Sequence, residues 1–256
     1  MTRAIVITRP QAQAGELAQR LQDAGHAVVM FPLLEIHALA DPAPLKAILA
    51  RLDEFALVAF VSPNAIDATF AHVDRWPESV PLAVMGEGSR RTLMHHGVTP
   101  ERYQITSPLD TRRTDSQTLL KVLKLDALRG RRVLILRGET GRELLGDALR
   151  GAGIEVLQVA AYRRAAPVLT PALADQLRML LASDDSWIIT SSEALQVVLG
   201  FAKAVDPEFG VVKLQQKNIF VPHQRIWETA QTLGFRHVCL TDAGDDGLFT
   251  ALQLRP

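Results

Sequence analysis

The sequence is poor in cysteine and in lysine, and it carries no net charge. A single thiol, Cys239, excludes a disulfide framework and a cysteine-based metal site, and it favours a reducing compartment. The 28 basic and 28 acidic residues balance, which argues against a protein that coats nucleic acid or anionic membranes through bulk charge. Because only six of the basic residues are lysine, 22 are arginine, the cation that grips carboxylate and phosphate groups through paired N–H donors.

Long apolar runs are also missing. No stretch approaches the roughly 20 apolar residues that a membrane span needs. The first residues, Met1-Thr2-Arg3, run straight into a strand-like segment without the pattern of a signal peptide. We therefore expect a soluble, cytoplasmic protein with neither nucleic acid nor membrane as a partner. The 256 residues, 48% of them hydrophobic, suffice for two ordinary domains or one large one.

The common cofactor and nucleophile motifs are absent as well. There is no phosphate-binding Walker sequence and no Gly-x-Ser-x-Gly elbow of a serine hydrolase. The nearest approach to a dinucleotide fingerprint, residues 86–91, lacks the third glycine that lets the helix pack against its strand. The seven histidines show no metal-ligand spacing. We therefore expect no cofactor and no metal.

What the sequence does contain is an alternation of short apolar segments with longer amphipathic ones. Runs that are apolar on both faces are typical of buried parallel strands. Helix-period segments such as 15–24 lie between them, and several end in glycine, at positions 25, 97, 153 and 234, as a left-handed helix terminus requires. This pattern predicts an α/β fold with parallel sheets. The expected strands are 4–8, 27–31, 57–61, 82–85, 103–106, 132–136, 155–160, 187–190, 218–221 and 237–241.

An internal repeat divides the ten expected strands into two sets of five. At an offset of 128, Arg9 falls on Arg137 and Gly25 on Gly153. Further on, segment 60–66 matches 189–195, and 85–86 matches 221–222. Five strands per half is the number in a flavodoxin-like doubly wound unit. The repeat alone leaves open whether each half folds by itself or exchanges strands with the other. Two extended, proline-containing segments at equivalent points, 32–44 and 162–171, are natural places for crossings that would form a two-segment hinge.

The candidate binding residues follow the expected strands, where open α/β sheets bind their ligands. Small polar residues there either cap the next helix or leave its N–H groups free to collect an anion. Arg9 and Arg137 occupy equivalent places after a first strand. Each either binds a ligand carboxylate, with the two arginines facing each other across an interdomain cleft, or forms a structural ion pair. The candidates are Thr8, Arg9, Ser62, Pro63, Asn64, Gly86, Arg137, Gly138, Ser191, Ser192, Pro222 and His223.

Several short segments, in order and at the right spacing, resemble the uroporphyrinogen-III synthase family across essentially the whole chain. They are Gly86 and residues 7–10, 60–66, 136–138, 161–164, 190–195 and 222–226. The resemblance implies two flavodoxin-like domains that exchange strands and are joined by a two-stranded hinge. One domain would comprise residues 1–36 and 168–256 and the other residues 40–163, with linkers at 37–39 and 164–167. It also implies a monomer.

The resemblance further implies a cyclising lyase of tetrapyrrole biosynthesis that needs no cofactor, and it leaves open whether the haem, sirohaem or corrinoid branch is served. Its substrate is hydroxymethylbilane, a linear tetrapyrrole with eight carboxylates, and hydroxymethylbilane synthase is the partner expected to hand it over. Loss of water and inversion of ring D through a spiro intermediate give uroporphyrinogen III, whereas the uncatalysed chain closes to isomer I. Tyr162 matches a tyrosine that the family places beside the cleft. Its phenol is the candidate acid for the departing hydroxyl, and the alternative is an aromatic side chain packed in the linker.

His223 stands at the end of an expected strand, where it either donates to a substrate carboxylate or caps a helix. Two other classes of protein share the two-lobed architecture. A non-catalytic small-molecule binding protein of the exported kind would need a signal peptide. A nucleotide-sugar transferase would show a glycine-rich phosphate loop and a carboxylate for the ribose. The sequence has none of these features, so the synthase remains the preferred hypothesis.

Overall fold

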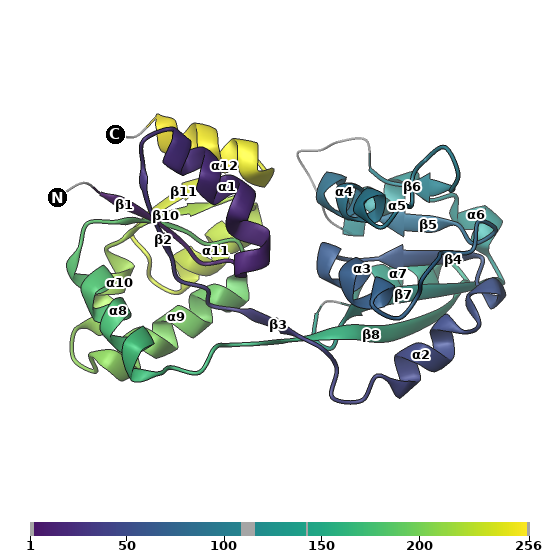
Figure 1. The fold of residues 1–256 in the computed structure, drawn as a ribbon, viewed down its shortest axis with the longest axis horizontal. Helices are drawn as coiled ribbons and strands as arrows, with labels where there is room; N and C mark the ends of the chain where they lie inside the picture. Colours follow the sequence, from purple (N-terminus) through teal and green to yellow (C-terminus); the bar gives the residue numbers. More distant parts are fainter. Residues whose placement is uncertain (1–2, 109–115, 142, 255–256) are drawn as a thin grey trace. The chain divides into compact units, whose positions relative to one another are not determined.

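The chain contains two parallel sheets, each covered by helices on both faces (Figure 1). A computed structural model describes residues 3–108, 116–141 and 143–254. Contacts divide the chain into two compact units, which we name unit 1 (Met1–Glu35 with Ala165–Pro256) and unit 2 (Ile36–Arg164). Among the described residues, no helix combines the length and the apolar character needed to traverse a membrane. The α/β class that the alternating pattern predicts is confirmed.

The sheet of unit 1 takes strands from both ends of the chain, in the order β11-β10-β9-β1-β2. All four pairings are parallel, and Val6 of the interior strand β1 lies between Val29 and Trp187. The order reverses at β1, because β2 pairs on one side of it and β9 on the other. The strands are β1 (Ala4–Ile7), β2 (Ala27–Met30), β9 (Ser186–Ile188), β10 (Asn218–Val221) and β11 (His237–Leu240).

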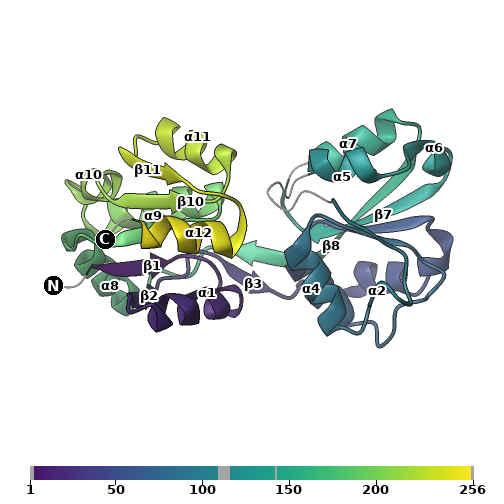
Figure 2. The same cartoon turned by 90° about the horizontal axis from the view of Figure 1, so that it is seen from above.

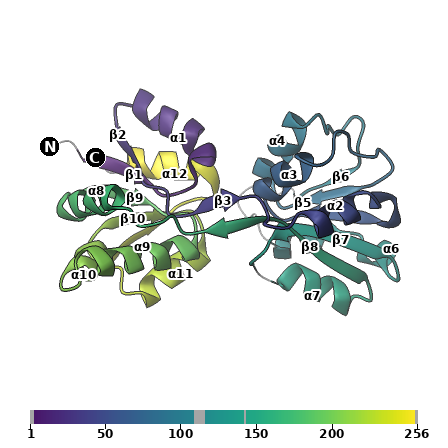
Figure 3. The ribbon, with the colours of Figure 1, turned by 60° about the horizontal axis from the view of Figure 1, so that its bottom comes forward.

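Side chains of β1 alternate between the two apolar layers of unit 1. Ile5 and Ile7 pack toward one set of helices and Val6 toward the other, and all three are buried. Figure 3 shows the two helix layers on opposite sides of the sheet. One layer consists of α1 (Gln11–Asp23) and α12 (Gly244–Gln253), and the other of α8 (Pro171–Ala182), α9 (Ser192–Val205), α10 (Gly210–Gln215) and α11 (Gln224–Thr232).

Unit 2 repeats this architecture with an additional edge strand, in the order β3-β8-β7-β4-β5-β6. Its pairings from β8 to β6 are parallel. The order reverses at β7, which pairs with β8 on one side and β4 on the other. The strands are β3 (Glu35–His37), β4 (Leu57–Phe60), β5 (Leu82–Val84), β6 (Ile105–Thr106), β7 (Arg132–Gly138) and β8 (Glu155–Ala165).

The helices of unit 2 form two layers, which Figure 2 shows on opposite sides of the sheet. The apolar residues of α2, α3 and α4 belong to one buried cluster and those of α5, α6 and α7 to another. These helices are α2 (Ala43–Leu49), α3 (Pro63–Phe70), α4 (Glu87–His95), α5 (Ser116–Val122), α6 (Leu125–Leu128) and α7 (Leu144–Gly151), and a 3₁₀ turn, η1 (Leu52–Glu54), precedes β4.

The strand orders show how the repeat is used. In each sheet, the first two strands of one half (β1 and β2, or β7 and β8) lie beside the three later strands of the other half (β9 to β11, or β4 to β6). The exchange of strands that the family resemblance implied is therefore present. The chain passes between the units at residues 35–36, within β3, and at residues 164–165, within β8. These two strands are neighbours in one sheet.

Sequence and structure differ at the crossing segments. Residues 35–37 form β3 inside the extended, proline-containing stretch 32–44, which is not among the expected strands. β8 runs to Ala165, beyond the expected end at residue 160. Prolines at 32, 42 and 44 flank β3 and cannot donate ladder hydrogen bonds, so the sequence pattern obscures a short strand between them. The glycines expected at helix ends are confirmed, since Gly25, Gly97, Gly153 and Gly234 all have positive φ.

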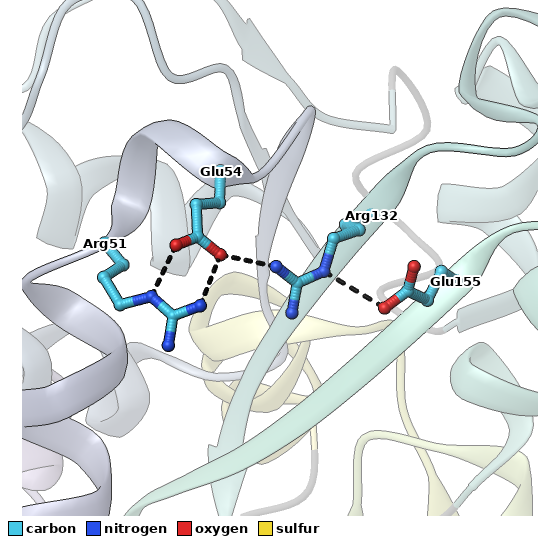
Figure 4. Close-up of polar contacts among 4 residues, drawn as sticks. All are labelled: Arg51, Glu54, Arg132 and Glu155. Carbon is cyan, nitrogen blue, oxygen red and sulfur yellow. Dashed lines mark hydrogen bonds and ion pairs between the residues drawn. The ribbon is translucent and has the colours of Figure 1, made fainter.

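A chain of ion pairs binds the start of β7 to its neighbours in unit 2 (Figure 4). Glu54 accepts from Arg51, at 2.5 and 2.8 Å, and from Arg132 at 2.5 Å, and Arg132 also donates to Glu155 at 3.1 Å. Arg132 and Glu155 are the first residues of β7 and β8, and Arg51 and Glu54 precede β4. All four therefore lie at the amino edge of the sheet, opposite the edge at which the candidate binding residues follow the strands. The network therefore anchors η1 to the sheet and takes no part in the candidate site.

We expect the stabilising effect of this network to decrease in acid, and comparison of the parent with Glu54→Gln tests this. Hydrogen bonds from Arg51, followed by those from Arg132, lower the pKa of Glu54 below its ordinary 4.5. A lowered pKa means that the carboxylate adds stability above pH 4.5, and that this contribution is lost as the pH falls through the folded-state pKa. Denaturant unfolding should show Glu54→Gln less stable than the parent at neutral pH, with the difference shrinking in acid. Asp53→Asn removes the same charge one residue away, and an identical pH profile in both variants would contradict the assignment.

Candidate functional site

The candidate residues of unit 1 lie at the carboxyl edge of its sheet, around the point where the strand order reverses. Thr8 is buried and its hydroxyl donates to the Ile188 carbonyl at 2.7 Å, which joins the ends of β1 and β9. Arg9 follows, and its Nη1 donates to Asp245 at 2.7 Å and to the Gln13 carbonyl at 3.3 Å. Asp245 stands in the first turn of α12. The Arg9 side chain is thus tied to a carboxylate of its own unit.

The other candidates of unit 1 begin helices. Ser191 caps α9, since its hydroxyl accepts from the backbone N–H groups of Glu193 at 3.1 Å and Ala194 at 3.4 Å. The Ser192 hydroxyl shares a 3.0 Å hydrogen bond with Thr229 of α11. His223 takes the cap position of α11 after the buried Pro222, but its side chain makes no capping hydrogen bond there. The cap interpretation therefore applies to Ser191 through its side chain and to His223 only through its position.

In unit 2, three candidates come together at the carboxyl ends of β4, β7 and β8. The Ser62 hydroxyl accepts from the Ala65 N–H at 3.2 Å, which caps α3, and it shares a 3.1 Å hydrogen bond with the Tyr162 phenol. The Tyr162 ring lies against Gly138, where an added Cβ would come within 3.1 Å of its Cζ. A register shift between Arg137 and Gly138 pairs Gly138 with Tyr162. The phenol therefore reaches the beginning of α3.

Tyr162 is a core residue as well as a candidate acid. It is 4% exposed and packs in the apolar cluster of β4, α3 and α4. Both roles considered for it, packing and proton donation, are compatible with this position, because the ring is buried while its hydroxyl meets the polar end of a helix. Pro63 and Asn64 form the first turn of α3, and the buried Gly86 stands before α4 with an extended backbone.

Arg137 lies at the same carboxyl edge of the unit 2 sheet as Tyr162, but on the opposite face of the sheet. Its side chain is 9% exposed, and its Nη1 donates to Glu143 at 2.5 Å and to Gln158 at 2.6 Å. Gln158 in turn donates to the second oxygen of Glu143. Hydrogen bonds from Gln158 and then Arg137 lower the pKa of Glu143. Sequence reasoning missed both partners, although a polar Gln158 inside the otherwise apolar start of β8 was a usable signal.

Every candidate residue thus lies at the carboxyl edge of its own sheet, at or beside the beginning of a helix or the end of a strand. The strand order reverses at this edge in both units, and such switch points are where doubly wound proteins bind ligands. Helix N-termini and arginines favour an anion there. Fold and geometry together define a two-unit, doubly wound α/β protein whose candidate residues gather at the carboxyl edges of its two sheets.

Comparisons with known proteins identify the family within this class to which the chain belongs. The profile of the family described as uroporphyrinogen-III synthase HemD matches residues 15–249. The uroporphyrinogen-III synthase of Salmonella typhimurium is 32% identical over 97% of this chain and 99% of its own, and that of Escherichia coli is 30% identical over the same shares. The chain belongs to the uroporphyrinogen-III synthase family, whose enzymes are cyclising lyases of tetrapyrrole biosynthesis.

Solved structures agree on the fold. A uroporphyrinogen-III synthetase from Helicobacter pylori superposes with a TM-score of 0.61 at 16% identity, over 99% of this chain and all of the other. A mutant uroporphyrinogen III synthase from Thermus thermophilus gives 0.58 at 15% identity, over 98% of each chain. At such low identity the likeness concerns the fold alone, and it confirms the two-domain α/β architecture.

Proposed function

We propose that this chain converts hydroxymethylbilane to uroporphyrinogen III, and that the candidate residues at the two sheet edges bind and fold the substrate. Membership of the synthase family over nearly the whole chain supports the reaction. The observation that carries the site is the hydrogen bond of 3.1 Å between the Tyr162 phenol and Ser62 at the beginning of α3. A phenol beside the backbone N–H groups of a helix N-terminus, which attract carboxylates, supports the role of Tyr162 as the acid.

The reaction begins with loss of the hydroxyl group from the terminal pyrrole. The carbon–oxygen bond breaks, its electron pair leaves with the oxygen, and the phenol proton of Tyr162 completes the departing water. The resulting azafulvene cation is attacked by the substituted position of ring D, which forms the spiro intermediate. Cleavage and recombination then invert ring D, and a proton lost from the closing macrocycle restores the phenol.

Selectivity for isomer III requires that the substrate be folded so that the spiro attack outpaces direct closure. Thr8, Ser62, Asn64, Ser191 and Ser192 offer hydroxyl, amide and helix N-terminal groups for the substrate carboxylates. Gly86, Gly138, Pro63 and Pro222 shape the turns that present the backbone, and His223 and the arginines add charge or hydrogen bonds. Because binding is distributed over many contacts, most single substitutions should reduce the rate without abolishing it.

An isomer assay tests this proposal. Hydroxymethylbilane is generated in situ, the protein is added, and the products are oxidised and separated by chromatography. We expect isomer III to predominate with the protein present and isomer I without it. A protein that only bound the tetrapyrrole would leave isomer I as the product, and that result would refute the proposed activity.

The setting of the reaction is proposed from the family resemblance. We expect the enzyme to work in the cytoplasm as a monomer and to receive its unstable substrate from hydroxymethylbilane synthase. The domain boundaries at 1–36 with 168–256 and 40–163 belong to the same proposal. Sedimentation of the purified protein checks the monomer, since a concentration-dependent increase in mass would contradict it.

A further inference from the structure

The surroundings of Arg137 form a cradle for one carboxylate. The guanidinium is 9% exposed and donates through Nη1 to one oxygen of Glu143 at 2.5 Å. The amide of Gln158 donates to the other oxygen of Glu143, while its own carbonyl accepts from Arg137 at 2.6 Å. Arginine and glutamine therefore hold each other in place and present two donors to the two oxygens of a single carboxylate.

Two glycines leave room for these donors. An added Cβ at Gly141, whose φ is +153°, would lie 2.7 Å from Nη2 of Arg137. An added Cβ at Gly146 would lie 2.5 Å from Nε2 of Gln158. Any larger residue at either position would have to displace a donor. The cradle thus depends on glycine on the guanidinium side and on the amide side.

The donors and their occupant differ in how firmly they are fixed. Arg137 and Gln158 belong to the paired strands β7 and β8. Glu143 stands just outside α7, at the end of the segment that follows β7, and its side chain is 54% exposed. A rotation of this one side chain would therefore empty the cradle without breaking the sheet. A buried guanidinium is costly without a counter-ion, so whatever displaces Glu143 must itself be an anion.

We propose that Arg137 and Gln158 form a carboxylate subsite, that Glu143 occupies it in the free protein, and that a substrate carboxylate displaces Glu143 on binding. The cradle follows from the geometry of unit 2 alone, whereas its assignment to hydroxymethylbilane rests on the proposed function. Gln158 thereby becomes a binding residue and Glu143 an internal competitor.

Competition has a measurable consequence. When a site is open for only a fraction of the time, its apparent affinity falls by that fraction. The hydrogen bonds that lower the pKa of Glu143 keep its side chain charged at neutral pH, so it competes throughout the range in which the substrate carboxylates are ionised. Removing the Glu143 carboxylate should therefore strengthen the binding of an external carboxylate, even though it removes a hydrogen-bonded partner.

Binding of tricarballylate, measured by calorimetry at constant ionic strength, tests the proposal. We expect Glu143→Ala to bind this tricarboxylate about 10-fold more tightly than the parent, as for a site open roughly a tenth of the time. Glu139→Ala is the matched control, because it removes the same charge from the same segment. Within the described part of the chain, the side chain of Arg137 donates to Glu143 and Gln158 and not to Glu139. Adding Gln158→Leu to Glu143→Ala should abolish the gain.

Equal changes in Glu143→Ala and Glu139→Ala would overturn the proposal, because net charge alone would then explain them. So would a lower melting temperature of Glu143→Ala without tighter binding, which would mark a purely structural ion pair. If Glu143→Ala does not fold, Glu143→Gln takes its place under the same criteria. The measurement needs no turnover, so failure of the isomer assay would refute the proposed activity and leave the test of the cradle intact.

Discussion

Tyr162→Phe should lower the rate of isomer III formation by about 100-fold, at the lower end of what a positioned acid contributes. The substitution keeps the ring that packs in the core and removes the hydroxyl that meets Ser62 at 3.1 Å. Loss of the proton donor slows departure of the substrate hydroxyl on the enzyme, while spontaneous closure in solution continues. The product should therefore shift toward isomer I. The rate and the isomer ratio are both read by chromatography after oxidation.

The second tyrosine of the chain provides the matched control. Tyr103 is also buried in unit 2, and its phenol donates to the Trp76 carbonyl at 3.4 Å, away from the carboxyl edge of the sheet. Tyr103→Phe removes an equivalent hydroxyl and should leave both rate and isomer ratio unchanged. If Tyr162→Phe also left both unchanged, Tyr162 would be a packing residue and the acid would have to be sought elsewhere.

The architecture was largely readable from the sequence because parallel strands buried on both faces leave a strong apolar signal. The repeat that places Arg9 on Arg137 corresponds to a real equivalence. Arg9 lies just after β1 and Arg137 lies at the carboxyl end of β7, and these are the strands at which the two sheets reverse order. The register of the repeat could not decide which strands share a sheet, because both halves offer the same strand pattern. That decision came from the family resemblance, and the strand orders agree with it.

The candidate site was predictable in its place and not in its contacts. The carboxyl ends of the strands collect Ser62, Gly138 and Tyr162, but their meeting depends on the register shift between Arg137 and Gly138, which has no sequence signature. The partners of the arginines escaped prediction for a similar reason. Asp245 and Glu143 reach Arg9 and Arg137 from segments whose path is set by tertiary packing. Both arginines therefore fit the ion-pair alternative in the free protein, and the cradle proposal reconciles this pairing of Arg137 with a role in binding.

Gly210→Ala is expected to destabilise the protein strongly. Gly210 is the first residue of α10, and an added Cβ there would lie 2.1 Å from the Ala202 carbonyl oxygen of α9 and 3.1 Å from the Cβ of Asp206. Since a backbone carbonyl cannot move aside as a flexible side chain can, the two helices would have to separate. We expect a loss of about 3 kcal/mol, at the upper end of overpacking effects. Calorimetry should show a melting temperature lower by roughly 10 °C.

At a glycine of the neighbouring helix α9, the same change to alanine should raise the stability of the protein instead of lowering it. Gly200 is an exposed interior residue of α9, and no atom lies within 4 Å of the position that its Cβ would take. Alanine there removes conformational freedom from the unfolded chain without a steric cost, so Gly200→Ala should stabilise the protein by about 0.5–1 kcal/mol. Because both substitutions add one methyl group to the same pair of helices, opposite shifts would establish close approach of α9 and α10 as the cause. Shifts of the same sign would contradict the packing of these helices.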